Sequence, residues 1–193
     1  MSKKSELLAA AELRVRDGGY ANFSFRELAS EVGIKSASVH YHFPTKEDLA
    51  AELAYQYTER FLTSLGDPSA YVQQGKNPIE VYTEHFRHAL LVDKQMCLCG
   101  LLGAESGSLP EKVKHETKRF FKRNINWLEQ AYTSLHITNS ESEITSKAMT
   151  TLALLEGALM ISKTLDSIDV FEHATAAIKG LAEIMGETTG RKK

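Results

Sequence analysis

The chain has 193 residues, 42% of them hydrophobic, and a formal net charge of -2, which is enough apolar material for one ordinary domain or two small ones. Apolar runs are short and interrupted by charges, so we expect neither a membrane span nor a secretory signal, and we expect the protein to be cytoplasmic. The only cysteines, Cys97 and Cys99, are too close together to form a disulfide framework, which fits a reducing compartment.

Apolar residues recur at helical spacing along the chain and alternating strand patterns are nearly absent, so we predict an all-α fold. Ser24 with Glu27 and Ser140 with Glu143 have the spacing of capping boxes, which open helices. We expect a linker at 66–78 and a disordered tail from about 187. In chain order, the predicted helices occupy about residues 8–18, 24–32, 36–42, 45–66, 77–92, 96–105, 110–128, 140–165 and 169–186.

Charge is divided unevenly between the two ends. Residues 1–46 contain seven basic and five acidic side chains, a net charge of +2, whereas the remainder carries a net charge of -4. A mildly basic head on an acidic body favours a polyanion as the partner of the head.

Two short helices joined at Gly33 after a longer first helix have the pattern of a helix-turn-helix, whose second short helix enters the DNA major groove. Glycine tolerates a positive φ at the turn, and the small Ala29 lets the helices cross closely. Ala37 can touch a thymine methyl group. The outer face of residues 36–42 and the residue before them carry side chains that can hydrogen-bond to bases: Lys35, Ser36, Ser38 and His40.

The run Tyr-His-Phe-Pro-Thr-Lys at 41–46 adds phosphate ligands. Tyr41 can donate its hydroxyl to a phosphate, and Thr45 and Lys46 lie at the start of the following helix. The amides and dipole of a helix N-terminus favour an anion, so we expect DNA phosphate there.

The segment FSFRELASEVGIKSASVHYHFPTKEDL, preceded by LLAAAELRVRDGGY, resembles the DNA-binding domain of the TetR family of transcriptional regulators over residues 7 to about 53. The resemblance implies a three-helix DNA-binding domain, residues 1–46, and a helical effector-binding and dimerisation domain, residues 47–193. It also implies that Ser24 and Arg26 meet phosphate, while residues 35–38 and His40 face bases.

A single recognition helix makes few contacts, so helix-turn-helix proteins usually dimerise on two half-sites, and we expect a homodimer on a palindromic operator in double-stranded DNA. The last two helices are the expected interface because small residues spaced four apart let helices approach closely. These residues are Ala153, Gly157, Ala176 and Gly180.

The middle of the chain is rich in aromatic and sulfur-containing side chains. The resemblance implies an effector pocket there, in which a small, largely apolar ligand would release a repressor from DNA by preferring a conformation with badly spaced heads. The same side chains would serve equally as ordinary core. The candidate pocket residues are Phe86, Met96, Cys97, Phe120, Trp127 and Met160.

Several alternatives stay open at this point. Cys97 or Cys99 could react with oxidants or electrophiles, which would require an exposed thiolate with a low pKa. His85 and His88 have a metal-compatible spacing beside Glu84, but the sequence offers no third ligand, and we expect no metal or cofactor. An all-helical enzyme is a further alternative, against which no nucleophile motif or phosphate loop is found. A DNA-binding protein without a small-molecule ligand is another.

Overall fold

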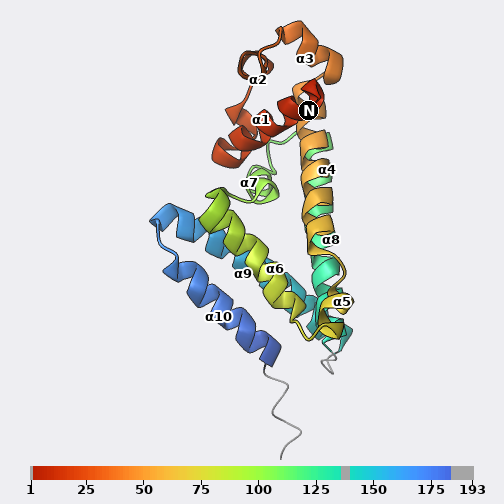
Figure 1. The fold of residues 1–193 in the computed structure, drawn as a ribbon, viewed down its shortest axis with the longest axis vertical. Coiled ribbons are helices and arrows are strands. Elements are labelled where there is room, and N and C mark those ends of the chain that lie inside the picture. Colours follow the sequence, from red (N-terminus) through yellow and green to blue (C-terminus); the bar gives the residue numbers. More distant parts are fainter. Residues whose placement is uncertain (1, 136–139, 184–193) are drawn as a thin grey trace, which may run out of the picture. The chain divides into compact units, whose positions relative to one another are not determined.

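A computed structural model describes residues 2–135 and 140–183, and within these ranges every regular element is helical (Figure 1), which confirms the predicted all-α fold. The elements are α1 (Lys3–Gly18), η1 (Tyr20–Asn22), α2 (Phe25–Val32), α3 (Ser36–His42), α4 (Lys46–Leu65), α5 (Pro68–Gln73), α6 (Pro78–His88), η2 (Ala89–Asp93), α7 (Leu98–Ala104), α8 (Glu111–Ser134), α9 (Glu141–Leu165) and α10 (Asp169–Glu183).

The chain divides into two compact units. Unit 1 comprises residues 1–63 and 95–121, and unit 2 comprises residues 64–94 and 122–193, so that both α4 and α8 pass from one unit to the other. Unit 1 therefore contains the N-terminal helices together with α7. The domain boundary predicted at residue 46 stays a prediction.

The helix starts follow from local side-chain chemistry. The Ser140 hydroxyl accepts from the Glu143 amide, and the Glu143 carboxylate accepts from the Ser140 amide at 2.7 Å, so the predicted capping box opens α9. The Ser24 hydroxyl likewise accepts from the Glu27 amide at the start of α2. These bonds satisfy amides that lack a partner within the helix.

Two predicted segments differ in kind from the structure, and α8 continues to Ser134 beyond the predicted residue 128. The expected linker at 66–78 contains α5, because the Asp67 carboxylate accepts from the Ser69 amide and Pro68 supplies a preset first helical residue. The helix expected up to residue 92 leaves α-geometry at His88 and continues as the π-turn η2. The predicted end of the last helix at Gly186 and the tail from 187 lie outside the described residues.

The core of unit 1 joins α1, α2, α3 and α4. Apolar side chains of all four helices point inward, and α1 also packs against α7. Burying a leucine or valine of this kind stabilises a fold by about 1.5–3 kcal/mol. The fully or almost fully buried members are Leu7, Ala11, Val15, Leu28, Ala29, Val39, Phe43, Leu49 and Leu53.

The core of unit 2 is built around α9, which packs against α10 and α6 (Figure 1). The aromatic ring of Tyr82 lies 5.5 Å from that of Phe86 and 5.4 Å from that of Trp127. The Tyr82 hydroxyl donates to Asn124 at 2.7 Å, and the Trp127 indole donates to the Gly66 carbonyl at 2.8 Å, so these buried polar groups are satisfied.

Candidate nucleic-acid interface

The turn between α2 and α3 has the conformation that the sequence predicts. Gly33 adopts φ 70° and ψ 40°, in the left-handed region that glycine enters without strain, and its amide bonds back to the end of α2. Leu28 and Val39 are fully buried beneath the two helices and Ala29 nearly so. The buried side of α3 is thus fixed against the rest of unit 1.

The outer side of α3 is open to solvent. Val39 is buried, whereas the residues predicted to face DNA from this helix are exposed, and Tyr41 has 86% of its surface accessible. Short polar side chains on an exposed helix of this kind match what major-groove readout requires. The exposed set is Lys35, Ser36, Ala37, Ser38, His40 and Tyr41.

His40 is held in one orientation by two neighbours. Its ring packs edge-on against Phe25 with centroids 4.9 Å apart, and its Nδ1 lies 3.2 Å from the carbonyl oxygen of Pro44. Because a carbonyl only accepts, Nδ1 carries the proton in this bond, which leaves Nε2 as the nitrogen available to another partner.

The two residues predicted to meet phosphate at the start of α2 differ in whether their side chains already have a hydrogen-bond partner among the described residues. Arg26 is exposed. The Ser24 hydroxyl instead donates to the Glu27 carboxylate at 2.7 Å, a bond that is the largest cause of the lowered pKa of Glu27. A phosphate at Ser24 would therefore share or displace this bond.

The start of α4 is capped by the protein itself. The amide and hydroxyl of Thr45 donate to Asp48 Oδ2 at 3.1 and 2.7 Å, and Lys112 Nζ lies 2.6 Å from the other carboxylate oxygen. The hydrogen bonds from Lys112 and Thr45 lower the pKa of Asp48. Thr45 is exposed, but its amide and hydroxyl already donate to the Asp48 carboxylate.

Lys46 points to an aromatic pair within unit 1. Its Nζ lies 4.7 Å from the ring centre of Tyr20 and 4.4 Å from that of Phe23, within the range of cation–π attraction. Burial lowers the pKa of Lys46, and the carboxylates of Glu27 and Glu105 act in the opposite direction. The predicted phosphate ligand is therefore half-buried at the edge of the DNA-binding face.

The model of the family described as bacterial regulatory proteins, tetR family, matches residues 7–53, the segment that forms this exposed helix-turn-helix. This segment is the DNA-binding domain of the TetR family. The protein is a DNA-binding transcriptional regulator.

The likeness to TetR-family proteins extends well beyond the matched segment. A curated relative, the HTH-type transcriptional regulator LmrA of Bacillus subtilis, is 23% identical over 182 residues, which cover 92% of this chain and 95% of LmrA. A TetR transcriptional regulator from Legionella pneumophila is 26% identical, with a TM-score of 0.82 and coverage of 93% of this chain and 97% of that one. The reduced form of E. coli NemR shares the fold at 20% identity, with a TM-score of 0.79 and the same coverage of both chains.

The four small residues predicted at a TetR-type dimer interface lie on α9 and α10, which pack against each other within unit 2. Ala153 and Ala176 are exposed, and among the described residues no atom lies within 4 Å of a Cβ built on Gly157 or Gly180. Among the described residues, α9 is also the one helix that is long and apolar enough to cross a membrane, by length and composition only. The large exposed apolar residues on α9 are Met149, Met160, Ile161 and Leu165.

The residues predicted to line an effector pocket fall into both units. In unit 2, Phe86 and Trp127 are buried on either side of Tyr82, whereas Met160 is half-exposed on α9. In unit 1, the ring of Phe120 contacts those of Tyr57, Phe61 and Phe121, and Met96 is half-buried. Within unit 2 the structure therefore brings Phe86 and Trp127 into one cluster around Tyr82.

Both cysteines are buried, with 3% of Cys97 and none of Cys99 accessible. Cys97 Sγ accepts from the Gly100 amide at the start of α7. Attack by an external electrophile requires access to the sulfur, so this arrangement protects the thiols. His85 and His88 also have separate neighbours, since His85 Nδ1 bonds the Val81 carbonyl and His88 lies near Asp93.

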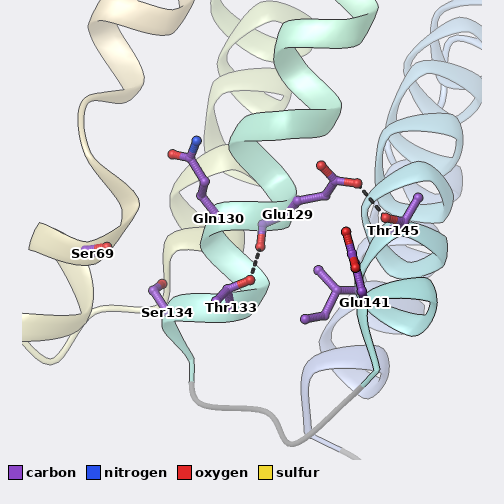
Figure 2. Close-up of a pocket in the computed structure, with 8 residues that line it drawn as sticks. Ser69, Glu129, Gln130, Thr133, Ser134, Glu141 and Thr145 are labelled. Atoms are coloured by element: carbon purple, nitrogen blue, oxygen red, sulfur yellow. Dashed lines mark hydrogen bonds between the residues drawn. The ribbon is translucent and has the colours of Figure 1, made fainter.

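Figure 2 shows a polar hollow in unit 2 where α5, α8 and the start of α9 meet. Its volume is about 490 Å³, and the Glu129 carboxylate within it accepts from the Thr145 hydroxyl at 2.6 Å. It shares no residue with the predicted effector pocket. The residues around it are Ser69, Glu129, Gln130, Thr133, Ser134, Glu141, Ile144 and Thr145.

The sequence does not predict the contacts of two charged residues, Arg16 and Glu105, each of which binds a backbone group of unit 1 that is distant in the sequence. Arg16 is buried on α1, where its Nε donates to the Met96 carbonyl at 2.7 Å and its guanidinium lies over the ring of Tyr57. Glu105 bonds the backbone at Tyr20. The position of Arg16 beside the apolar Val15 is a local sign of its contact with Met96. No local pattern indicates the contact between Glu105 and Tyr20.

Proposed function

We propose that the protein is a transcriptional repressor that binds a palindromic operator as a homodimer and is released by a small, largely apolar effector. Residues 1–46 read the DNA and residues 47–193 bind the effector and the second subunit. The protein acts in the cytoplasm and as a regulator rather than an enzyme.

The observation that carries the DNA-binding part is the contrast between the two sides of α3. One side is fixed by Val39, while Lys35, Ser36, Ala37, Ser38 and His40 stand open to solvent. Short donors and acceptors on a rigidly seated helix can reach base edges without first ordering a loop.

Dimerisation is supported by the exposed apolar side of α9. Met160 and Leu165 keep 51% and 63% of their surface accessible, which is unusual for large apolar side chains on a helix in the middle of a packed unit. A second copy would cover this surface, and the open space beside Gly157 would let the two helices approach closely.

The effector part is supported by chemistry rather than by a described cavity. The buried cluster of Phe86, Tyr82 and Trp127 offers aromatic surface and a hydroxyl–amide pair, the combination that small-molecule sites use for affinity and orientation. A ligand that opens this cluster would favour a different arrangement of unit 2 and would weaken DNA binding by its differential affinity.

The test is binding to a duplex that the wild-type protein selects from a random-sequence pool. Ser38→Asp places a negative charge on the open side of α3 and should weaken binding by at least tenfold, because one lost base contact alone is worth about 1–3 kcal/mol. Thr63→Asp, at an exposed hydroxyl on α4 in unit 1, is the matched control and should bind nearly as the wild type does. Equal losses in the two variants would show that α3 does not read the DNA.

Repression is tested by transcription in vitro from a promoter that overlaps the selected duplex. The protein should lower transcript yield, and apolar compounds that restore the yield are effectors. A rise in yield on adding the protein would identify an activator instead.

A further inference from the structure

Glu105 stands at the end of α7 in a position that helix electrostatics disfavours. A carboxylate at a helix C-terminus meets the negative end of the helix dipole, which is unfavourable. The backbone of Glu105 is nevertheless tightly held. Its amide donates to the carbonyls of Leu101 and Leu102, and its own carbonyl accepts from both the amide and the hydroxyl of Ser108. These hydrogen bonds fix the backbone from which the Glu105 side chain extends.

The Glu105 carboxylate is aimed at the backbone of the DNA-binding head. The Tyr20 amide donates to both carboxylate oxygens at 3.2 Å, at the first residue of η1, which leads into α2. A hydrogen bond to an ionised acceptor is stronger than one between neutral groups. Tyr20 therefore receives a charged partner at an amide that its own short helix cannot satisfy.

Gly19 makes this approach possible. A Cβ built on Gly19 would lie 1.6 Å from Glu105 Oε1, far inside contact distance, and the residue also has φ 78°. Gly19 is buried beneath the carboxylate. Any other residue at this position would push Glu105 away from Tyr20, so the glycine is required by the contact as well as by the turn.

The same carboxylate bears on Lys46, the first residue of α4. The Lys46 ammonium is packed over Tyr20 and Phe23 and is drawn by the charges of Glu27 and Glu105. Glu105 therefore contacts the turn that precedes α2 directly, and its charge also favours the protonated form of Lys46 at the start of α4. A second tie runs from the same segment of the chain, since Arg16 on α1 binds the carbonyl of Met96.

We propose that Glu105 is a positioning residue for DNA binding, which holds the Tyr20 amide at the turn before α2 and thereby fixes the helix-turn-helix that this turn leads into. The proposal rests on the proposed DNA-binding face. The predicted change in DNA affinity is opposite to the one expected from charge alone, because removing a negative charge near DNA should strengthen binding to phosphate. Loss of the Glu105 carboxylate is instead expected to weaken sequence-specific binding.

The experiment compares Glu105→Ala, Glu105→Gln and Asp17→Ala. Asp17 is an exposed carboxylate near the end of α1, so its removal matches the change in charge without touching the Tyr20 contact. Affinities are measured for the duplex selected by the wild-type protein and for a scrambled duplex of equal length, well below the melting temperature of every variant. Hydrogen exchange at the Tyr20 amide is followed by NMR in the same samples.

Glu105→Ala should lose about tenfold in affinity for the selected duplex, keep its affinity for the scrambled duplex, and exchange the Tyr20 amide faster. Glu105→Gln, which keeps an acceptor oxygen, should recover most of both properties, and Asp17→Ala should bind at least as tightly as the wild type. An affinity for the selected duplex that is unchanged or increased in Glu105→Ala would overturn the proposal. Failure of the wild type to select any duplex would instead overturn the proposed DNA-binding face.

Discussion

Replacing Gly157 by tryptophan separates folding from dimerisation. Among the described residues, no atom lies within 4 Å of the position of a new Cβ, so the side chain leaves the helix into open space in the isolated subunit. Tryptophan also has a better helix propensity than glycine by a few tenths of a kcal/mol, so α9 should be at least as stable. Only a second helix packed closely against this point would meet the ring.

The size of the effect follows from symmetry. Overfilling a packed contact costs about 1–3 kcal/mol, and a two-fold axis places the substitution in the interface twice, so dimerisation should weaken by about 2–6 kcal/mol. This corresponds to a rise of about thirtyfold or more in the dissociation constant of the dimer. Sedimentation velocity over a range of concentrations measures it, and circular dichroism checks the fold.

The control for this prediction is Gly107→Trp in unit 1, where the described residues also leave open space around the Cβ position. It should sediment as the wild type does. If Gly157→Trp also stays dimeric at the same concentrations, the interface lies away from this part of α9.

Three further predictions address the head and the thiols. His40→Asn keeps a donor near Pro44 but cannot reach from the Nε2 position, so it should bind the selected duplex about tenfold more weakly than His40→Gln; equal affinities would show that Nε2 makes no DNA contact. Because the pKa of Asp48 is lowered in the fold, its stabilising effect should be complete above about pH 3.9 and lost as pH falls further. The melting temperature of the wild type should thus exceed that of Asp48→Asn at pH 7 and approach it near pH 2, and a constant difference would refute this. N-ethylmaleimide should release the wild type and the Cys97→Ser, Cys99→Ser variant from DNA at the same rate, because both thiols are buried, and faster release of the wild type would revive the thiol-sensor alternative.

Local chemistry explains which elements could be predicted from the sequence. The capping pairs at Ser24 and Ser140 and the turn at Gly33 depend on residues within four positions of each other, so their spacing indicates them directly. The Asp67–Pro68 pair is equally local and has the form of a helix start, but the glycines and polar residues around it favoured a linker.

Long-range contacts explain what could not be predicted. The bond between Glu105 and Tyr20 joins residues 85 positions apart, and it depends on a backbone turn that leaves room beside Gly19. Hydrophobic periodicity places Phe86 and Trp127 on buried helix faces, but it cannot tell whether two buried faces meet around a ligand or around each other. Effector residues are therefore predicted only from composition and resemblance, whereas α3 is predicted from its own pattern of apolar and polar positions.

The lone tryptophan of the chain gives the molecule a built-in optical reporter. Trp127 is 6% accessible, its indole nitrogen donates to the Gly66 carbonyl, and its ring lies against that of Tyr82, so its emission reports on the interior of unit 2. A shift in that emission when DNA is added, with no dye attached, would mean that DNA binding by unit 1 changes the surroundings of Trp127 in unit 2. Linkage then requires reciprocity: a compound that binds unit 2 and weakens DNA binding is itself bound more weakly, by the same factor, when DNA is present.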